Sequence, residues 1–195
     1  MPMLVQDFLD CYDFIYVKPQ GTSNFGGTGI YIRENLNYKV RYEVKDLFAN
    51  TANHVEIVCV DISTPDSSYT VVTMYRYSNK GSVKDFQNDL DNLFQYLNNE
   101  SNNIILVGDI NINLLNIQND NTKQYIDNLI INNFTPCITL PTILTETTAT
   151  LIDHIYLNLK MSDINDTILA GNLLTDITDH LPNFLLLGTP TKDSV

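Results

Sequence analysis

Residues 104–111 constrain the fold of this sequence more than any other segment. Residues 104–107 are four apolar residues in a row, which is typical of a fully buried strand. Gly108 allows a tight exit from that strand, and Asp109 and Asn111 follow it. Because residues two apart on an extended chain face the same way, we expect Asp109 and Asn111 to emerge side by side at the end of a buried strand.

Two further segments place polar side chains within or beside apolar runs. Asp153 and His154 interrupt the apolar run 151–156, and Thr-Asp-His at 178–180 stands just before the run 184–187. Binding and catalytic groups often gather at strand ends in α/β sheets. The predicted cleft brings together these residues: Asp109, Asn111, Asp153, Asp179 and His180.

The hydrophobic period changes along the chain from that of strands to that of helices. Residues 1–80 form short alternating or apolar runs separated by turn residues. Apolar residues then recur at intervals of three and four in 83–97 and in 122–132, which predicts two amphipathic helices. The predicted strands are 12–17, 28–33, 38–44, 54–61, 69–77, 104–107, 137–140, 151–157 and 183–187. Successive hairpins with few helices favour two packed sheets flanked by helices over a parallel, doubly wound sheet.

Capping residues mark the start of both predicted helices. Ser82 is the expected N-cap of the first helix, with Asp85 in its first turn. Asn121 and Gln124 form the expected capping pair of the second helix. The expected inward residues of the second helix are Tyr125, Ile126, Leu129 and Ile130.

The charge of the chain is acidic and unevenly spread. A net charge of −12 argues against an electrostatic nucleic-acid binder, because such proteins usually present a basic face. Residues 96–195 hold three Lys or Arg against eleven Asp or Glu. An anionic substrate in this half needs a cation to offset the repulsion, which favours a divalent metal ion.

The length of the chain and its cysteine content indicate how many domains it forms and in which compartment it works. At 195 residues the chain is long enough for one core, so we expect a single domain over residues 1–195. The three cysteines are far apart and match no zinc spacing or disulfide framework, which favours a reducing, intracellular compartment. No secretory signal and no apolar run near the roughly 20 residues of a membrane helix stand out, so we expect no membrane partner.

Five short motifs, in this order, carry a resemblance to a known family. They lie at 26–32, 74–76, 108–115, 150–155 and 178–180, and Pro141-Thr142 also fits the pattern. Together they resemble the endonuclease/exonuclease/phosphatase superfamily, and most of all the endonuclease domain of non-LTR (LINE-type) retrotransposons. The resemblance implies a DNase I-like four-layer α/β (α+β) sandwich, in which helices flank two mostly antiparallel sheets.

The resemblance also implies a reaction and a setting. Members hydrolyse phosphodiester bonds, and the retrotransposon branch nicks DNA with Mg²⁺ or Mn²⁺ as cofactor. The implied partner is therefore DNA, the implied location is the nucleus, and the expected state is a monomer. Two alternatives stay open: a catalytically inactive remnant of the domain, and a phosphodiesterase or phosphatase of the same superfamily with another substrate.

The roles of the candidate residues follow from the same resemblance. Asp109 orients and deprotonates the attacking water, and Asn111 holds a phosphate oxygen without repelling it. Asp153 fixes the tautomer of His180, which faces the scissile phosphate. Tyr75 places its hydroxyl near the phosphate. Asp179 serves as a second carboxylate on the metal side or on the water side, and we expect it to be a metal ligand.

Some elements of the family pattern are missing from this sequence. Family domains open with a strand that carries an Asn and a strand whose Glu binds the metal, and we expect the chain to begin after both. The reverse transcriptase that follows such domains is expected to be absent from this chain. The glutamates of the sequence do not match the metal-binding position: Glu34, Glu43, Glu56, Glu100 and Glu146.

Other polar or glycine-rich features are expected to be structural. His154 should face away from the site by strand alternation, and His54 should be an ordinary strand-edge residue. The glycines of 26–29 lead into a strand and lack the Lys-Ser/Thr of a phosphate loop, so we expect a hairpin turn there. Arg76 either faces a nucleic-acid backbone or packs its stem on apolar surface.

Overall fold

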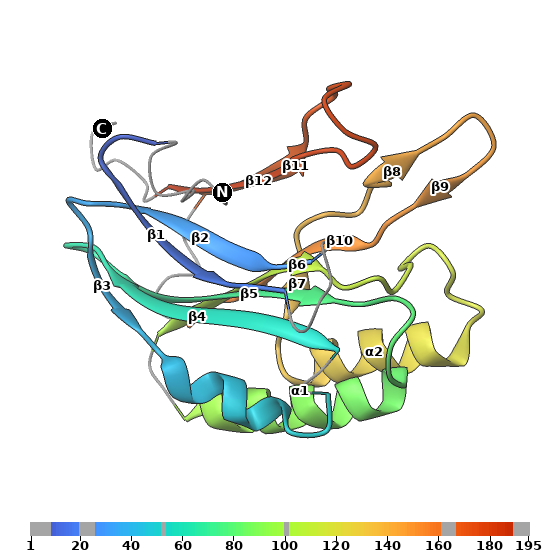
Figure 1. Ribbon diagram of the computed structural model, residues 1–195, viewed down its shortest axis with the longest axis horizontal. Helices are drawn as coiled ribbons and strands as arrows, with labels where there is room; N and C mark the ends of the chain where they lie inside the picture. Colours follow the sequence, from blue (N-terminus) through green and yellow to red (C-terminus); the bar gives the residue numbers. More distant parts are fainter. Residues whose placement is uncertain (1–8, 20–25, 52–53, 100–101, 161–166, 189–195) are drawn as a thin grey trace, which may run out of the picture.

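The computed structural model describes residues 9–19, 26–51, 54–99, 102–160 and 167–188 (Figure 1). A six-stranded mixed sheet forms its centre, in the order β3-β4-β5-β6-β10-β7. β5 and β6 pair in parallel, and the other neighbours in this sheet pair antiparallel. The bounds of its strands are β3 Asn37–Val40, β4 Val55–Ser63, β5 Ser68–Arg76, β6 Asn103–Asp109, β7 Thr135–Pro136 and β10 Asp153–Asn158.

The two faces of the large sheet have different covers. Three helices lie together on one face: the 3₁₀ helix η2 (Tyr42–Phe48), α1 (Val83–Asn98) and α2 (Asp120–Ile131) (Figure 1). Two hairpins lie on the other face: β1 (Tyr12–Val17) with β2 (Thr28–Arg33), and β11 (Thr167–Asn172) with β12 (Asn183–Gly188). A small ribbon pairs β8 (Ile143–Leu144) with β9 (Ala149–Thr150). The predicted α/β sandwich is confirmed, and no helix of the described residues covers the hairpins.

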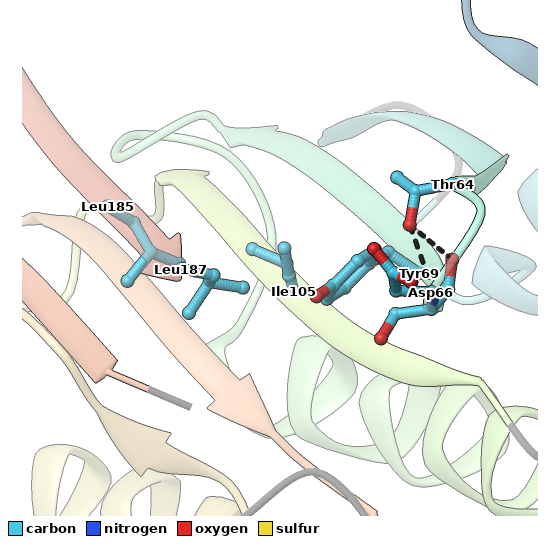
Figure 2. A pocket seen from close by; sticks show the side chains of 7 residues that line it. Thr64, Asp66, Tyr69, Ile105, Leu185 and Leu187 are labelled. Atoms are coloured by element: carbon cyan, nitrogen blue, oxygen red, sulfur yellow. Dashed lines mark hydrogen bonds between the residues drawn. The ribbon is translucent and has the colours of Figure 1, made fainter. Parts of the chain in front are cut away.

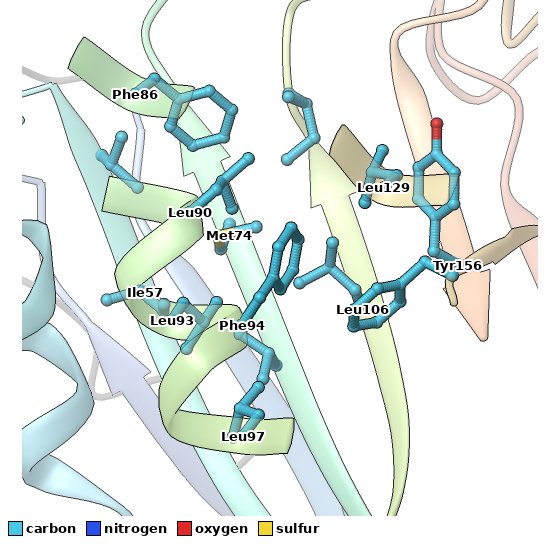
Figure 3. Close-up of a cluster of buried hydrophobic side chains, with 14 of the residues drawn as sticks. Ile57, Met74, Phe86, Leu90, Leu93, Phe94, Leu97, Leu106, Leu129 and Tyr156 are labelled. Atoms are coloured by element: carbon cyan, nitrogen blue, oxygen red, sulfur yellow. The ribbon is translucent and has the colours of Figure 1, made fainter. Parts of the chain in front are cut away.

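The core lies between the sheet and the helices. The apolar residues of α1, spaced by three and four, turn towards Met74 of β5 and Leu106 of β6 (Figure 3). Burying one such side chain contributes about 1.5–3 kcal/mol relative to leaving it exposed. Ser82 caps the helix as predicted, because its Oγ accepts a hydrogen bond from the backbone N–H of Asp85 at 3.0 Å. The α1 residues in this core are Phe86, Leu90, Leu93, Phe94 and Leu97.

The predicted strand 38–44 is wrong at its second half. The strand β3 ends at Val40, and the chain then turns into the 3₁₀ helix η2. Val44 and Phe48 are each 1% exposed, so both enter the helix-side core from positions four apart. That helical spacing, set by packing against α1, overrode the local alternation of Tyr and Val.

The start and the apolar face of α2 also differ from prediction. Asn119, rather than Asn121, caps the helix, and its side chain accepts from the backbone N–H groups of Asn121 and Thr122. Tyr125 and Leu129 are buried as expected, but Ile130 is 59% exposed. The inward face of α2 runs through Thr122, Tyr125 and Leu129, and Ile130 lies outside that face.

Two further differences concern strands. The predicted strand 137–140 is wrong, because the strand β7 occupies Thr135–Pro136 and a loop follows. Residues 167–172 form β11, which the sequence did not predict because Ile168 and Leu169 are both exposed and no alternation is visible. None of the described helices combines the length and the apolar composition that a membrane crossing requires.

At Gly108 the backbone of β6 lies so close to that of β5 that no side chain fits. The φ of Gly108 is +145°, and a Cβ at this position would lie 1.8 Å from the carbonyl oxygen of Met74. We expect Gly108→Ala to lower the free energy of unfolding by more than about 2 kcal/mol in urea titrations. Gly188→Ala is the matched control, because a Cβ there meets nothing nearer than 3.9 Å. Equal unfolding midpoints for the two variants would contradict this account of the β5–β6 contact.

Candidate active site

The register of the central sheet aligns a row of polar side chains across four strands. Tyr75 of β5 lies opposite Asp109 of β6, and Asp109 lies opposite Asp153 of β10. On the other side of the row, Glu56 of β4 lies opposite Tyr75. Partners in adjacent strands share a face, and neighbouring strands are about 4.8 Å apart. The row therefore crosses the sheet on one face at the end of β6.

His180 joins this row through Asp153. The Nδ1–H of His180 donates to Asp153, with distances of 3.0 Å to Oδ1 and 2.9 Å to Oδ2. A β-bridge between Ile143 and His180 holds the backbone of the histidine against the β8 segment. The predicted pairing of Asp153 with His180 is present, and it leaves Nε2 of the partly exposed ring available to a substrate.

Asp109 has an unusual electrostatic environment. Burial first, and the nearby Asp153 second, raise the pKa of its carboxyl group to about 6. His180 and the backbone N–H of Asn111 act in the opposite direction, and that N–H lies 3.2 Å from Oδ1. A carboxyl group with this pKa accepts protons near neutral pH better than an ordinary aspartate does.

The turn after Asp109 is held from the neighbouring strand. Asn111 has a φ of +54°, and its Nδ2 donates to the carbonyl oxygen of Arg76 at 2.7 Å. Arg76 donates in return to the carbonyl oxygens of Ile110 and Asn111, and its guanidinium lies over the ring of Phe86. Arg76 is 4% exposed, so it fixes the turn from inside rather than facing a nucleic acid.

Tyr75 lies between two carboxylates in the row. Burial raises the pKa of its hydroxyl, and the charges of Asp109 and Glu56 add to that effect. Its ring packs edge-on against Tyr77, with centroids 4.9 Å apart. The hydroxyl therefore stays protonated at neutral pH and can act as a hydrogen-bond donor.

Glu56 and Tyr77 were missed as parts of this region. The side chain of Glu56 is buried and accepts from the hydroxyl of Tyr77 at 2.7 Å and from the backbone N–H of Gly27. The sequence carried a signal for this, because Glu56 alternates with Val58 and Val60 on one face of its strand. A carboxylate on an otherwise apolar strand face needs partners to compensate its burial.

His154 points to the opposite face of β10, as expected. It is 3% exposed, its Nε2–H donates to the carbonyl oxygen of Ile112 at 3.1 Å, and its Nδ1 faces the hydroxyl of Tyr125. Burial lowers the pKa of His154 to about 4, so the ring is neutral at physiological pH. Its structural role is confirmed by this burial.

Three of the expected residues form a cluster that could hold a cation. One ligand atom from each of Asp109, Asp153 and His180 lies within 4.8 Å of the others. Asp179 is exposed and is not one of the residues in this cluster. The two carboxylates suit a hard divalent ion.

The arrangement of these elements matches solved structures of one superfamily. No model of a known protein family and no curated protein matches the sequence. The structure superposes on the endonuclease domain of TRAS1, a telomere-specific non-LTR retrotransposon, with a TM-score of 0.70, at 15% identity over 92% of this chain and 80% of that chain. The chain has the DNase I-like fold of the endonuclease/exonuclease/phosphatase superfamily.

Other structures with this endonuclease/exonuclease/phosphatase fold match with similar coverage. A humanized TDP2 from D. rerio gives a TM-score of 0.67 at 13% identity, over 94% of this chain and 79% of that chain. A mannosyl-6-phosphatase from Bacteroides thetaiotaomicron gives 0.59 at 12% identity, over 94% and 79%. The likeness is thus one of fold, shared by proteins that act on different substrates.

The raised pKa of Asp109 has a consequence for stability. Since its pKa in the folded protein exceeds the ordinary value, ionisation opposes folding, and stability is lost as the pH rises through about 6. With a chelator present to remove metal ions, Asp109→Asn should therefore raise the free energy of unfolding by about 1–2 kcal/mol at pH 8. At pH 4 the same change should raise it by almost nothing. Urea titrations at the two pH values measure the difference.

The exposed Asp176 supplies the matched control for this measurement. Asp176→Asn should leave stability unchanged at both pH values, because the side chain is solvated. A stabilisation by Asp109→Asn that is the same at pH 4 and pH 8 would count against an electrostatic cause.

Proposed function

We propose that this chain is a divalent-metal-dependent phosphodiesterase that nicks DNA. The observation that carries the proposal is the row of Tyr75, Asp109 and Asp153, extended by His180, on one face of the sheet. Among proteins of the same fold, TRAS1 has an endonuclease domain and a D. rerio TDP2 was solved with a single-strand DNA product. These neighbours favour DNA as the substrate.

Asp109 and His180 carry the reaction in this proposal. Asp109, beside Asp153 at the end of β6, orients the attacking water and accepts its proton. His180 presents Nε2 to the scissile phosphate, since Nδ1 is committed to Asp153. Asp153 therefore acts as a positioning residue that sets the tautomer and direction of the imidazole ring.

Asn111 and Tyr75 bind the phosphate rather than transfer protons. The left-handed backbone at Asn111 turns its amide back towards β5, close to Asp109. One hydrogen of that amide bonds Arg76, and the other can reach a phosphate oxygen. Tyr75 offers its protonated hydroxyl from the opposite side of Asp109. The amide and the hydroxyl carry no net charge. Each can donate a hydrogen bond to the negative charge that develops on the phosphate.

Mg²⁺ or Mn²⁺ is the cofactor that these residues suit. The oxygen atoms of Asp109 and Asp153 would hold it, and we propose that Asp179 contributes a third carboxylate. The ion would offset the negative charge of the phosphate and of the leaving oxygen. The acidity of this half of the chain, with three Lys or Arg against eleven Asp or Glu, makes such compensation necessary.

An inactive remnant of such an enzyme is the second candidate. The observation in its favour is the small donor set, because the described residues bring only two carboxylates and one imidazole together. A cation held by so few charged ligands binds weakly. Any activity should therefore need metal at millimolar concentration.

Nicking of supercoiled plasmid tests the proposal directly. The purified chain should convert plasmid to the open circular form in Mn²⁺ or Mg²⁺ and not in excess EDTA. Asp109→Ala and His180→Ala should each lower the rate at least about 100-fold, since each removes a group that acts on the reacting atoms. Asp176→Ala, a nearby exposed aspartate, should keep the full rate.

The same nicking assay tests whether Asp179 contributes to metal binding. Asp179→Ala should raise the metal concentration that gives half-maximal rate, with little change at saturating metal. Efficient nicking in EDTA, or a His180→Ala variant with the wild-type rate, would contradict the mechanism. No nicking by wild-type protein at any metal concentration, with Mn²⁺ binding intact, would favour the inactive remnant.

Metal binding should depend on pH through Asp109. A proton and a cation compete for its carboxylate, so Mn²⁺ should bind about tenfold more weakly at pH 5 than at pH 8. Isothermal titration or the paramagnetic signal of free Mn²⁺ measures this without any substrate. Asp109→Asn should remove most of the pH dependence, and Asp176→Asn should retain it; an affinity that is constant between pH 5 and pH 8 would exclude Asp109 from the metal site.

A further inference from the structure

The carboxylate of Glu56 ties the hairpin layer to the central sheet beside the candidate active site. Glu56 lies in β4 and is 1% exposed. Its Oε1 accepts a hydrogen bond from the hydroxyl of Tyr77 at 2.7 Å, and its Oε2 accepts one from the backbone N–H of Gly27. Tyr77 directly follows β5, and Gly27 directly precedes β2. Because a buried carboxylate is stable only when donors compensate its charge, these bonds fix Glu56 between the two layers.

The turn before β2 fits closely over Tyr77. Gly26 has a φ of +103°, and a Cβ there would lie 2.2 Å from the hydroxyl oxygen of Tyr77. Directly after this turn, the hydroxyl groups of Thr28 and Thr73 form a hydrogen bond, with their oxygens 2.8 Å apart. The turn is therefore bonded to the central sheet through Glu56 and through Thr73, and it contacts the hydroxyl end of Tyr77.

The ring of Tyr77 is also held by its neighbours on the same strand and in the loop that follows. The Nζ of Lys80 lies 3.8 Å from the ring centroid, in a cation–π contact. The ring of Tyr75 packs against that of Tyr77 at 82°, with centroids 4.9 Å apart. Tyr77 is 6% exposed, so its ring has little room to turn. The position of Tyr77 therefore limits where the ring of Tyr75 can lie.

Tyr75 connects these contacts to the polar row. In the register of the sheet, Glu56 lies opposite Tyr75, and Tyr75 lies opposite Asp109. Tyr77 and Gly27 supply a donor to each oxygen of Glu56. The burial of that carboxylate therefore makes no demand on the hydroxyl of Tyr75, which the proposed mechanism assigns to the phosphate.

We propose that Glu56 is a positioning residue, which acts through Tyr77 to hold the hydroxyl of Tyr75 where it meets the phosphate. Glu56 does not act on the reacting atoms, because both of its oxygens are bonded within the protein. Its effect is geometric: with Tyr77 released, the ring of Tyr75 loses the edge contact that limits its rotation. A misplacement of about 1 Å can cost on the order of 10²-fold in rate. This inference rests on the proposed function, since it assigns a residue to the same reaction.

Asp61 is a matched control on the same strand. Its Oδ1 accepts from the hydroxyl of Thr70 at 2.8 Å, and its Oδ2 pairs with Nη1 of Arg41 at 3.0 Å. Like Glu56, it is a carboxylate of β4 that is bonded through both oxygens, but it lies about 17 Å further along the strand. If Glu56 only stabilised the fold, substitution of either residue would have the same kind of effect. A positioning role instead predicts an effect on the reaction for Glu56 alone.

A double-mutant cycle in the nicking assay tests the proposal, with rates referred to the folded fraction of each variant. At saturating Mn²⁺, Glu56→Ala should lower kcat at least about tenfold and change the KM for plasmid less than about twofold. In a Tyr75→Phe background the same substitution should change kcat less than about twofold, because the hydroxyl that Glu56 positions is already absent. Asp61→Ala should leave kcat unchanged in both backgrounds. An equal effect of Glu56→Ala in both backgrounds, or a loss of kcat in Asp61→Ala, would overturn the proposal.

Two milder variants keep the test valid if Glu56→Ala fails to fold. Tyr77→Phe removes only the hydroxyl that Glu56 holds, and it should lower kcat at least about threefold, but not in the Tyr75→Phe background. Glu56→Gln should keep kcat within about twofold of wild type, since its amide can accept from Gly27 and donate to the oxygen of Tyr77. A full rate in Tyr77→Phe, or a loss in Glu56→Gln as large as in Glu56→Ala, would refute a geometric role.

Fluorine NMR reports the position of Tyr75 without any reaction. In protein labelled with 3-fluorotyrosine, the resonance of Tyr75 is the one that Tyr75→Phe removes. Glu56→Ala should shift or broaden this resonance, because the ring then loses its fixed neighbour. Glu56→Gln and Asp61→Ala should leave the resonance in place.

Tyr69 supplies the internal control for this measurement. It lies on the same face of β5 as Tyr75, about 20 Å away, and lines a pocket with Ile105 and Leu187 (Figure 2). Its resonance should be the same in Glu56→Ala as in wild type. A Tyr75 resonance that moves no more than that of Tyr69 would overturn the proposal. A displaced Tyr75 resonance would support the positioning of Tyr75 by Glu56, whereas failure of the wild-type chain to nick plasmid would count against the proposed function alone.

Discussion

The parallel pairing of β5 with β6 is the constraint on which the rest of the structure depends. α1 connects the two strands and covers them with five buried apolar residues. The pairing requires the backbones to approach so closely at Met74 that only a glycine fits at position 108. Because the strands run in the same direction, Tyr75 and Asp109 reach the same sheet edge together. The core packing and the polar row are thus consequences of a single strand pair.

The polar row is stable only because other elements hold it. Asp109 and Asp153 repel one another, and burial makes the charge of Asp109 costly. The surrounding groups compensate in part: His180 bonds Asp153, and the backbone of Asn111 bonds Asp109. Arg76 secures that turn through two carbonyl oxygens from beneath the sheet. The site therefore combines local electrostatic strain with a rigid frame, as binding sites for cations often do.

Most of the sandwich could be predicted from periodicity alone. The strands 12–17 and 28–33 and the helix from Val83 appear as predicted, because turn residues bound the two strands and the apolar residues of the helix sit on one face. Prediction failed at 41–44, where Tyr42 and Val44 continue the local alternation of a strand, but Val44 packs with a helical spacing against α1. Such contacts between distant segments leave no trace in a short window of sequence.

The sequence predicted which polar residues of the candidate site lie together, but not how the side chains around them are buried. Motif order pointed to Asp109, Asp153 and His180, and these three lie together. Burial decided the rest: it turned Arg76 inward and enclosed Glu56 beneath Tyr77 and Gly27. Which face of a strand is covered, and by what, depends on the packing of whole layers. The acidic residue on the apolar face at 56 was visible in the sequence, but its partners were not.

His180 belongs to the segment that links β11 to β12, whereas Asp109 and Asp153 belong to the central sheet. The candidate site is therefore assembled from residues of the central sheet and of the segment that links the strands of a separate two-stranded sheet. Among the residues that the structure describes, the terminal hairpin shares no strand pairing with the other hairpin, and we expect that a sub-global opening of this hairpin would leave the sheet and helices folded. Such an opening would withdraw the imidazole and dismantle the site without denaturing the protein. The fraction of molecules competent for chemistry is then set by the local stability of one hairpin and can be much smaller than the fraction that is folded.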